Sequence, residues 1–505
     1  MKSLQPATVI ELSVNGTVLL SEDIRGLSEV RVEQRLSLPS QCELTFIELR
    51  GGFPLPLMIG DTLTVTPIGA ATTLFSGDVT ALHHSYEASR GRVLRVRAYD
   101  RLHRLRKRQP VRAHVEVTPA TLAYELAVDL AVAVEIHAEG PQSRRLLQYR
   151  HNDLEMLEEL AERCGQYFIL HDGTLNLFTL EGFGDPVALH LGEELLEARV
   201  EVNGDPACRS VAAVGWDPHR VEQHQGRAER ARSGRTASAT ADPGVFGTDG
   251  AVNLMGVVVQ DARQAEALAQ GALDRRIARE VALAGVADGD PSLHPGMRVS
   301  IEGLDADHAG IYVLTAVTHQ LDAQRGFTSR FTSEPPLPRA RSSGASATLG
   351  VVCRIDDPEH IGRVQVSLPG LGGLESDWLE VMSVGAGAGK GLMALPDVGD
   401  QVLVLAIDGD PGRGVVIGGL YGAGGWPDNG IEADAVRRFT LKTPGGQRVL
   451  LDDHGELVRV ENQHGSFVEL APGRVTVHAE GTGLTVEAPG QPIVIRGKSI
   501  DFEDA

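Results

Sequence analysis

The acidic cluster DDPEH is one of the few places where this sequence gathers residues that could do chemistry. Asp356, Asp357, Glu359 and His360 could bind a metal ion or act as general acid and base, because carboxylate and imidazole groups do both. An Asp–Pro pair beside the start of a strand is, however, typical of a turn. We therefore interpret DDPEH as a turn and predict neither a metal site nor a catalytic residue there.

The segment GDPGRG, residues 409–414, resembles a phosphate-binding loop only superficially. Such a loop ends in Gly-Lys-Ser/Thr and leads into a helix, whereas this segment lacks that ending and leads into the apolar run GVVIGGL. Asp408 and Asp410 would also repel a phosphate group. The segment is typical of a turn between two strands, and no cofactor is expected.

A basic run, RLHRLRKRQ, stands out in a chain whose formal net charge is −21. Two interpretations stay open: a solvated loop or helix face, or a docking surface for protein partners. Nucleic acid is not expected as the primary ligand, because its binding relies on a basic surface and this chain is acidic. The residues that would dock a partner are Arg101, Arg104, Arg106, Lys107 and Arg108.

The histidine in GRVTVHAEG could bind iron or zinc if three copies of it met on an oligomer axis. His478 shares its strand parity with Thr476, however, while Val475 and Val477 point to the other side. No His-X-His pair accompanies it. We predict that His478 points outward and holds no metal.

The tryptophans and cysteines also favour structural roles. Trp378 and Trp426 flank a strand-rich segment, where core packing is favoured over ligand stacking. The cysteines are far apart and form no CxxC or Cys/His metal spacing, which is typical of free thiols in a reducing compartment. They are Cys42, Cys164, Cys208 and Cys353.

Composition limits the class of protein. The 505 residues are enough for about three or four domains. Aromatic residues make up only 4%, while 58 glycines suit many tight turns between short strands. The N-terminus lacks a signal-peptide run, and no stretch of about 18 apolar residues could span a membrane. Synthesis in the cytoplasm is expected, with any later export by another route.

Short strands must position all of these residues. Period-two alternation predicts a β-barrel in residues 1–110 and a second in 196–335. Between them, residues 111–195 form a linking α+β segment, in which NDLEMLEELAERCG is a helix capped by Asn152 or Asp153. Residues 336–349 and 426–437 are linkers by composition. About five short strands in 350–425 have the size of an OB-fold.

Residues 438–505 contain an approximate repeat in which glycine recurs every seven to ten residues. Each rung offers only about two apolar side chains, so one chain would have little core and long unpaired edges. Three identical chains wound round one axis would fill the axis and pair the edges, which predicts a homotrimer. The predicted axis residues are Val449, Leu451, Val458, Val460, Val475, Val477, Leu484, Val486, Ile493 and Ile495.

The middle of the chain resembles the OB-fold of VgrG-type spike proteins, the central spikes of type VI secretion systems, contractile phage tails and extracellular phage-tail-like particles. The similar stretches are DDPEHIGRVQV, SDWLEV, PDVGDQVLV and GDPGRGVVIGGLY. Upstream, YRHNDLEMLEELAERCGQYFILHDGTLNLF resembles the segment that links two barrels of the hub in this family. The OB-fold signature residues are Asp357, Pro358, Gly362, Arg363, Trp378, Pro396, Gly399, Asp400, Gly409, Asp410, Pro411, Gly418 and Leu420.

This resemblance implies a mainly β fold with a few helices: two hub barrels, an OB-fold collar and an intertwined triple-stranded β-needle. It implies a structural role, in which the hub adapts a hexameric tube to a trimeric needle that punctures a target envelope when a sheath contracts. Expected partners are the tube protein and baseplate components at the hub and a PAAR-type or similar cap at the needle tip, with effector cargo as a further candidate.

An enzyme is not expected. Ala423 to Arg438 is too short to hold the lysozyme domain of some phage spikes, and the chain ends at KSIDFEDA without a toxin domain. Two alternatives stay open: a phage tailspike that processes glycans, and an OB-fold module that binds glycan or nucleic acid. A tailspike enzyme should show a carboxylate pair among aromatic-rich strands, and this chain is aromatic-poor. The sequence does not separate the three kinds of injection machine, nor does it identify the target cell, the cargo or a tip metal.

Overall fold

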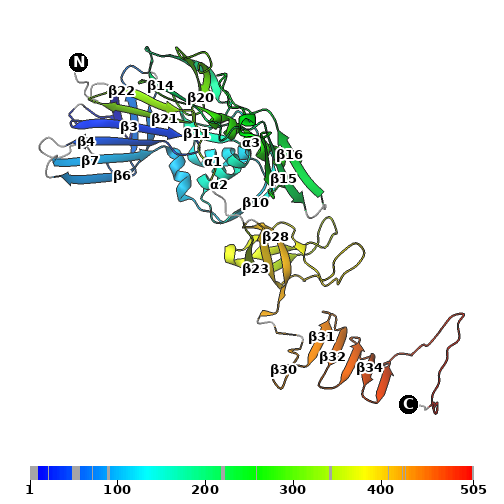
Figure 1. Cartoon of the computed structure of the whole chain (residues 1–505). Helices are drawn as coiled ribbons and strands as arrows, with labels where there is room; N and C mark the ends of the chain where they lie inside the picture. The colour runs from blue at the N-terminus through cyan, green and yellow to red at the C-terminus, as the bar shows by residue number, and fades with distance from the viewer. Residues whose placement is uncertain are drawn as a thin grey trace. The chain divides into compact units, whose positions relative to one another are not determined.

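The computed structural model describes residues 10–20, 22–47, 57–70, 72–87, 91–217, 222–257, 259–339, 344–407, 409–422, 425–426 and 428–502. The chain divides into two compact units, Met1–Gly418 and Gly419–Ala505, each considered by itself. The fold is mainly β (Figure 1), which confirms the predicted class. In the described residues the α-helices are α1 (Pro119–Leu130), α2 (Asp153–Arg163) and α3 (Ala262–Glu280). None of these helices is long and apolar enough to cross a membrane.

An eleven-stranded sheet forms the centre of the first unit. In spatial order its strands are β14 (Leu195–Val202), β18 (Val281–Asp288), β22 (Gly326–Thr332), β21 (Ala316–Asp322), β3 (Leu27–Arg35), β4 (Gln41–Ile47), β7 (Gly91–Tyr99), β6 (Phe75–Glu87), β5 (Thr62–Pro67), β1 (Ile10–Val14) and β2 (Thr17–Val18). β21 pairs with β3, from Ala316 opposite Arg35 to Asp322 opposite Glu29. One apolar core collects side chains of β1 and β3–β7, and another those of β14, β18, β21 and β22. The two predicted barrels therefore share one sheet, and their boundaries stay a prediction.

Smaller sheets and two 3-10 helices complete the described hub part of this unit. The sheets are β10 (Ser143–Gln148) with β8 (Arg112–Val117); β11 (Tyr167–His171), β12 (Thr174–Phe178) and β9 (Ala133–Ile136); β13 (Phe183–His190), β19 (Met297–Glu302) and β20 (Gly310–Val313); and β16 (Glu222–Ala228), β15 (Ser210–Asp217) and β17 (Ala251–Met255). The 3-10 helices are η2 (Arg101–Lys107) and η3 (Pro243–Phe246).

Helix α2 shows how local sequence fixes an element. The Asn152 side chain accepts a hydrogen bond from the Glu155 backbone N–H at 3.0 Å, and the Asn152 N–H donates to the Glu155 carboxylate at 3.1 Å. This reciprocal pair is a capping box, so Asn152 is the N-cap and Asp153 the first helical residue. The helix buries Leu154, Leu157 and Leu160, as their spacing predicts.

The OB-like part of the first unit is a six-stranded sheet with a short 3-10 helix, η4 (Pro369–Leu371). Its strands, in spatial order, are β25 (Leu374–Glu375), β24 (Gln365–Leu368), β23 (Ser346–Arg354), β27 (Gln401–Ile407), β28 (Asp410–Leu420) and β26 (Glu380–Val381). Alternate residues of β27 are buried, namely Val402, Val404 and Ala406, so one face of this strand lines the core.

The second unit contains a small hairpin, β29 (Ile431–Glu432) with β30 (Ala435–Val436), and a five-stranded antiparallel meander. We call the meander the C-terminal sheet; it comprises β31 (Arg438–Lys442), β32 (Arg448–Asp452), β33 (Leu457–Glu461), β34 (Phe467–Ala471) and β35 (Arg474–His478). Residues 479–502 contain no strand, although the repeat predicts further rungs there. A strand needs a neighbouring strand for its backbone hydrogen bonds, and none of the described strands pairs with that segment.

Candidate functional site

One face of the C-terminal sheet is entirely apolar and open to solvent. Its side chains form two columns across the five strands, because cross-strand partners lie on the same face. One column is Phe439, Leu451, Val458, Leu470 and Val475, and the other is Leu441, Val449, Val460, Val468 and Val477. Val475 is 68% exposed and Phe439 is 61% exposed. Full burial of such a side chain is worth about 1.5–3 kcal/mol, so this face is a strong candidate for an interface.

The opposite face of the C-terminal sheet carries the charged side chains of its strands, several of them paired, around the buried Leu450. Arg459 lies 2.6 Å from Glu461 and 3.2 Å from Glu469, and its guanidinium lies 3.8 Å from the centre of the Phe467 ring. His478 also lies on this face, with Nε2 2.9 Å from the Glu480 carboxylate. The described residues contain no group of three or more His, Cys, Asp or Glu side chains placed to hold a metal ion.

The predicted axis residues divide into two groups in the structure. Six lie in the two columns of the apolar face: Val449, Leu451, Val458, Val460, Val475 and Val477. The other four, Leu484, Val486, Ile493 and Ile495, are 49–68% exposed and lie outside any strand. Four further members of the same face were not predicted, although RFTLK and FVELA show the same alternation: Phe439, Leu441, Val468 and Leu470. Their role at an axis stays a proposal.

The DDPEH cluster is a closed turn. The buried Asp357 carboxylate accepts hydrogen bonds from the backbone N–H groups of Glu359 at 3.1 Å and Ile361 at 3.0 Å, and lies 2.6 Å from the Arg363 guanidinium. Hydrogen bonding to Arg363 holds the pKa of Asp357 well below its usual range. Asp356 pairs with Arg354 at 3.0 Å. These carboxylates are occupied in holding the turn.

The other OB-fold signature residues lie in turns and strand ends. Gly399 and Gly409 have positive φ angles of 94° and 74°, which suits glycine. The Asp400 carboxylate accepts from the Asp397 N–H at 2.8 Å, and Asp410 accepts from the Gly412 N–H at 2.9 Å. Pro358 and Gly362 lie in the DDPEH turn, Pro396 lies in the connection before β27, and β28 contains Pro411, Gly418 and Leu420.

The two tryptophans differ from each other. Trp378 is half-buried, with the Arg354 guanidinium 5.3 Å from its ring centre. Trp426 is 66% exposed and lies against Tyr421, with ring centres 4.2 Å apart, so the prediction that it packs in a core is wrong. In GDPGRG, residues 410–414 already belong to strand β28, so the prediction of a turn holds only at Gly409. The segment continues as a strand where a phosphate loop would lead into a helix. Asp408 lies outside the described residues.

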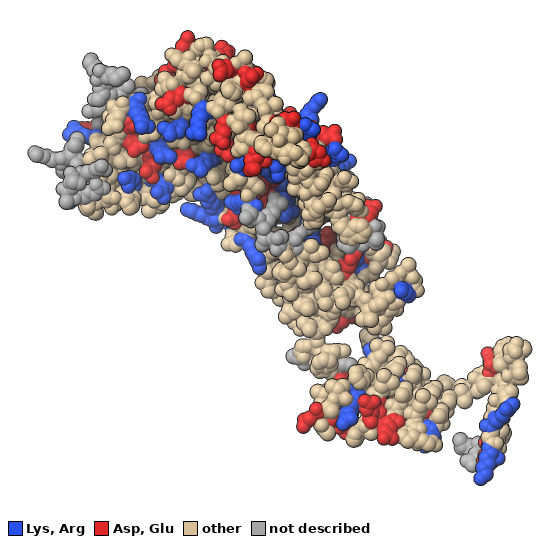
Figure 2. Space-filling model, in the orientation of Figure 1, with Lys and Arg blue, Asp and Glu red and all other residues tan. Residues whose placement is uncertain are grey.

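The basic run forms η2 and is largely paired within the protein. Arg104 binds the Asp78 carboxylate through two hydrogen bonds, of 2.7 and 2.9 Å, and Arg108 lies 2.6 Å from Asp129. Arg106 lies over the Tyr99 ring at 5.4 Å. Figure 2 shows Lys and Arg side chains interspersed with acidic ones over the visible face of the first unit. Docking of a partner by this run stays a prediction, in which the exposed side chains would make most of the contacts.

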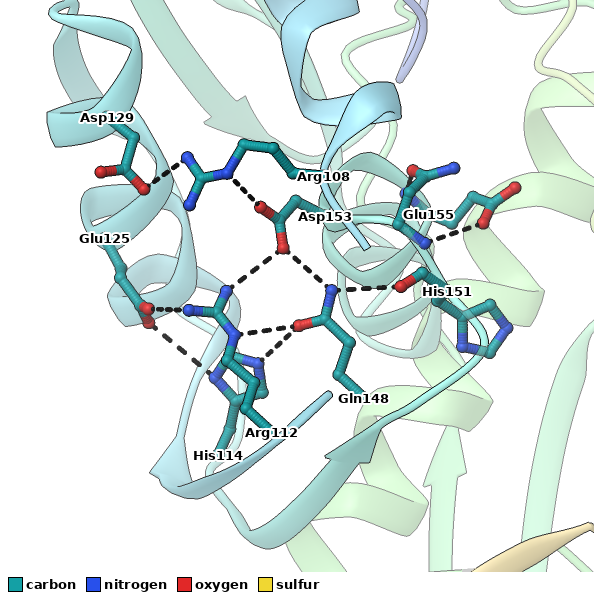
Figure 3. A network of polar contacts seen from close by, with 10 residues as sticks. Arg108, Arg112, His114, Glu125, Asp129, Gln148, His151, Asp153 and Glu155 are labelled. Carbon is teal, nitrogen blue, oxygen red and sulfur yellow. Dashed lines mark hydrogen bonds and ion pairs between the residues drawn. The ribbon is translucent and has the colours of Figure 1, made fainter. Parts of the chain in front are cut away.

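A buried polar network lies where η2, β8, β10 and α2 meet (Figure 3). Gln148 and Asp153 are both 0% exposed. The Gln148 amide donates to Asp153 Oδ1 at 2.9 Å and its Oε1 accepts from Arg112 Nε at 3.1 Å. Asp153 also pairs with Arg108 at 3.1 Å and Arg112 at 3.2 Å. From the sequence, Asp153 is a candidate only for the helix cap, because nothing in the neighbouring residues indicates these distant partners.

Two families match parts of the chain. Residues 68–323, half of the chain, match the family described as the Alg8 N-terminal domain. Residues 348–421 match the family described as the type VI secretion system/phage-baseplate injector OB domain.

Individual relatives agree with the second of these families. The chain is 28% identical over 258 residues to the type VI secretion system spike protein VgrG4b of Pseudomonas aeruginosa, a match that covers 44% of this chain and 30% of that protein. Two structures of the Francisella PdpA–VgrG complex resemble its fold. The lidded form has a TM-score of 0.55 at 8% identity and covers 94% of this chain and 80% of that chain. The half-lidded form has a TM-score of 0.54 at 8% identity and covers 93% and 88%.

Proposed function

The chain belongs to the family of the Alg8 N-terminal domain and is a VgrG-type spike protein, a structural part of an injection machine of the type VI or phage-baseplate kind, and we propose that three copies of it form one spike. In this trimer the apolar faces of three C-terminal sheets meet on a common axis. The observation that carries the proposal is the ten-residue apolar face that a single chain leaves open to water.

A trimer explains more than a face-to-face dimer would. Two sheets packed together would cover the apolar face, but they would leave residues 479–502 without strand partners. Wound chains satisfy both needs, because each chain supplies edges for its neighbours as well as side chains for the axis. Leu484, Val486, Ile493 and Ile495 would then continue the needle.

The solution mass of the full chain tests the trimer. We expect three times the 53.9 kDa of one chain. Val477→Asp places a charge on the apolar face and should reduce the mass to that of one chain, since a buried unpaired charge is costly. Thr476→Asp, on the next residue and the opposite face, is the matched control and should remain trimeric. A native mass of one chain, or equal behaviour of the two variants, would contradict the proposal.

The remaining functions are proposed for the assembled particle. The two predicted barrels of each hub would give a six-part ring that seats a hexameric tube and baseplate components, while the needle, with a PAAR-type or similar cap, punctures the target envelope. Effector cargo is a further candidate partner. This role is mechanical and needs no catalytic residue or cofactor. Purified trimer should bind tube protein at its hub end, and a trimer that does not would contradict the adaptor role.

A further inference from the structure

The two-stranded ribbon formed by β8 and β10 lies between two different cores. The strands pair from Ser143 opposite Val117 to Gln148 opposite Arg112. Successive residues of a strand point to opposite faces. Leu146 belongs to the core formed with α1 and α2, whereas its neighbour Leu147 belongs to the core of the OB-like sheet. The two side chains are 5% and 6% exposed, so the ribbon is buried on both sides at this point.

On the OB side, the ribbon makes contacts that depend on close approach. The Tyr149 hydroxyl donates to the Gly409 carbonyl at 2.8 Å, and Arg145 Nε donates to the Glu375 carbonyl at 3.1 Å. A Cβ atom at Gly412 would lie 3.1 Å from the Leu147 side chain, which is tighter than ordinary contact. Leu147 therefore fills a space in the OB-like part that its own strands leave open.

On the hub side, the network of Figure 3 holds the same ribbon. Gln148 and Arg112 are the last and first residues of its two strands and both bind Asp153, at 2.9 and 3.2 Å. Arg112 also reaches Glu125 of α1 at 2.6 Å. Buried polar groups joined by several hydrogen bonds and ion pairs, as here, favour one specific arrangement, so the ribbon is fixed to both helices.

From this placement we infer that the β8–β10 ribbon is a latch that couples the OB-like part to the hub helices within one chain. One face of the ribbon completes the OB core through Leu147, helped by Tyr149 directly after β10, and the other face is held to α1 and α2 through the contacts of Arg112 and Gln148 with Glu125 and Asp153. The coupling does not depend on the proposed spike function, but its use, to carry load from hub to collar, rests on that function.

Hydrogen exchange of the full-length protein tests the latch with a matched pair of variants. Leu147→Ala should speed exchange about tenfold or more in peptides from β23, β27 and β28, because local stability tracks local packing. Leu146→Ala removes the same atoms from the adjacent residue and should speed exchange in α1 and α2 instead. The latch is excluded if Leu147→Ala leaves the OB peptides unchanged, or if Leu146→Ala affects them equally.

Two gentler variants keep the test valid if Leu147→Ala does not fold. Tyr149→Phe removes only the hydroxyl that binds Gly409 and should speed exchange severalfold in residues 409–414 while leaving α2 unchanged. Gln148→Ala should speed exchange on both sides of the ribbon, and an effect confined to the hub side would overturn the coupling. Hydrogen exchange on the purified protein tests the latch, whereas the solution mass tests the trimer, so either proposal can fail without the other.

Discussion

Asp357 shows how a residue that looked chemically competent acts in the structure. It forms a buried ion pair with Arg363, and the two side chains are 3% and 6% exposed. Removing Asp357 takes the buried partner from Arg363 and leaves it the exposed Glu359 carboxylate at 3.2 Å, so the buried positive charge is compensated less well. Asp357→Asn should therefore destabilise the OB-like part by roughly 3 kcal/mol, measured by urea unfolding in a Trp216→Phe, Trp426→Phe background, where the fluorescence comes from Trp378. Asp356→Asn, in an exposed pair, is the control and should change stability little; equal effects would contradict this account.

Three histidines predict how stability depends on pH. His171 and His294 have ring centres 4.0 Å apart, and His319 lies 2.9 Å from Ser329 Oγ and 3.0 Å from the Leu293 carbonyl. Burial lowers the pKa of His294 and of His319 to about 4 each. The carboxylate of Asp172 lies 3.6 Å from the ring of His171, next to the His171–His294 ring pair.

The sign follows from proton uptake. Between pH 6.5 and 4 the unfolded chain binds protons at His294 and His319 and the folded chain does not, so stability falls as the pH falls through that window. At pH 5 the loss should be about 2 kcal/mol for each of His294 and His319 relative to neutral pH. His319→Gln should flatten the pH profile of unfolding, whereas an unchanged profile would show that His319 is not buried neutral.

Among the elements, the basic run at η2 contains both arginines that form ion pairs within the protein and a lysine that is exposed to solvent. Arg104 and Arg108 hold Asp78 and Asp129, while Lys107 is an exposed residue of the same run. If the run docks a baseplate partner, reversing the charge of Lys107 should weaken binding of that partner without destabilising the fold. Lys107→Glu should weaken association with the tube or baseplate at least severalfold, and more at low salt, without lowering the melting temperature.

Lys390→Glu, which reverses the charge of an exposed residue in the OB-like part, is the matched control. Equal binding by both variants would exclude η2 as a docking element.

At the scale of the whole molecule, the proposed needle should be kinetically stable. Strands shared among three chains cannot separate one at a time, so the barrier to unfolding is shared as well. The full-length protein should therefore migrate as a trimer in SDS without heating and as a single chain after boiling. Val477→Asp should migrate as a single chain under both conditions, and Thr476→Asp should resemble the parent. A parent protein that dissociates without heating would contradict the shared-strand arrangement.

Local patterns were enough for much of this protein, because they depend on neighbours in sequence. Alternation in β27 and in the C-terminal sheet, the cap at Asn152 and the turn chemistry of DDPEH all follow from residues a few positions apart. The same alternation could also have identified Phe439 and Leu470 as members of the apolar face. The prediction for Trp426 was wrong and its side chain is exposed, because the residue type alone does not show whether another part of the fold covers the ring.

Only the tertiary structure decided which distant segments meet. The pairing of β21 with β3 joins strands almost three hundred residues apart; Leu147 enters the OB core from the hub, and Asp153 gathers Arg108, Arg112 and Gln148. Each of these contacts joins side chains whose local sequence is ordinary. These contacts are stabilised by burial and by pairing between distant segments. Both arise only when the folded chain has brought those segments together.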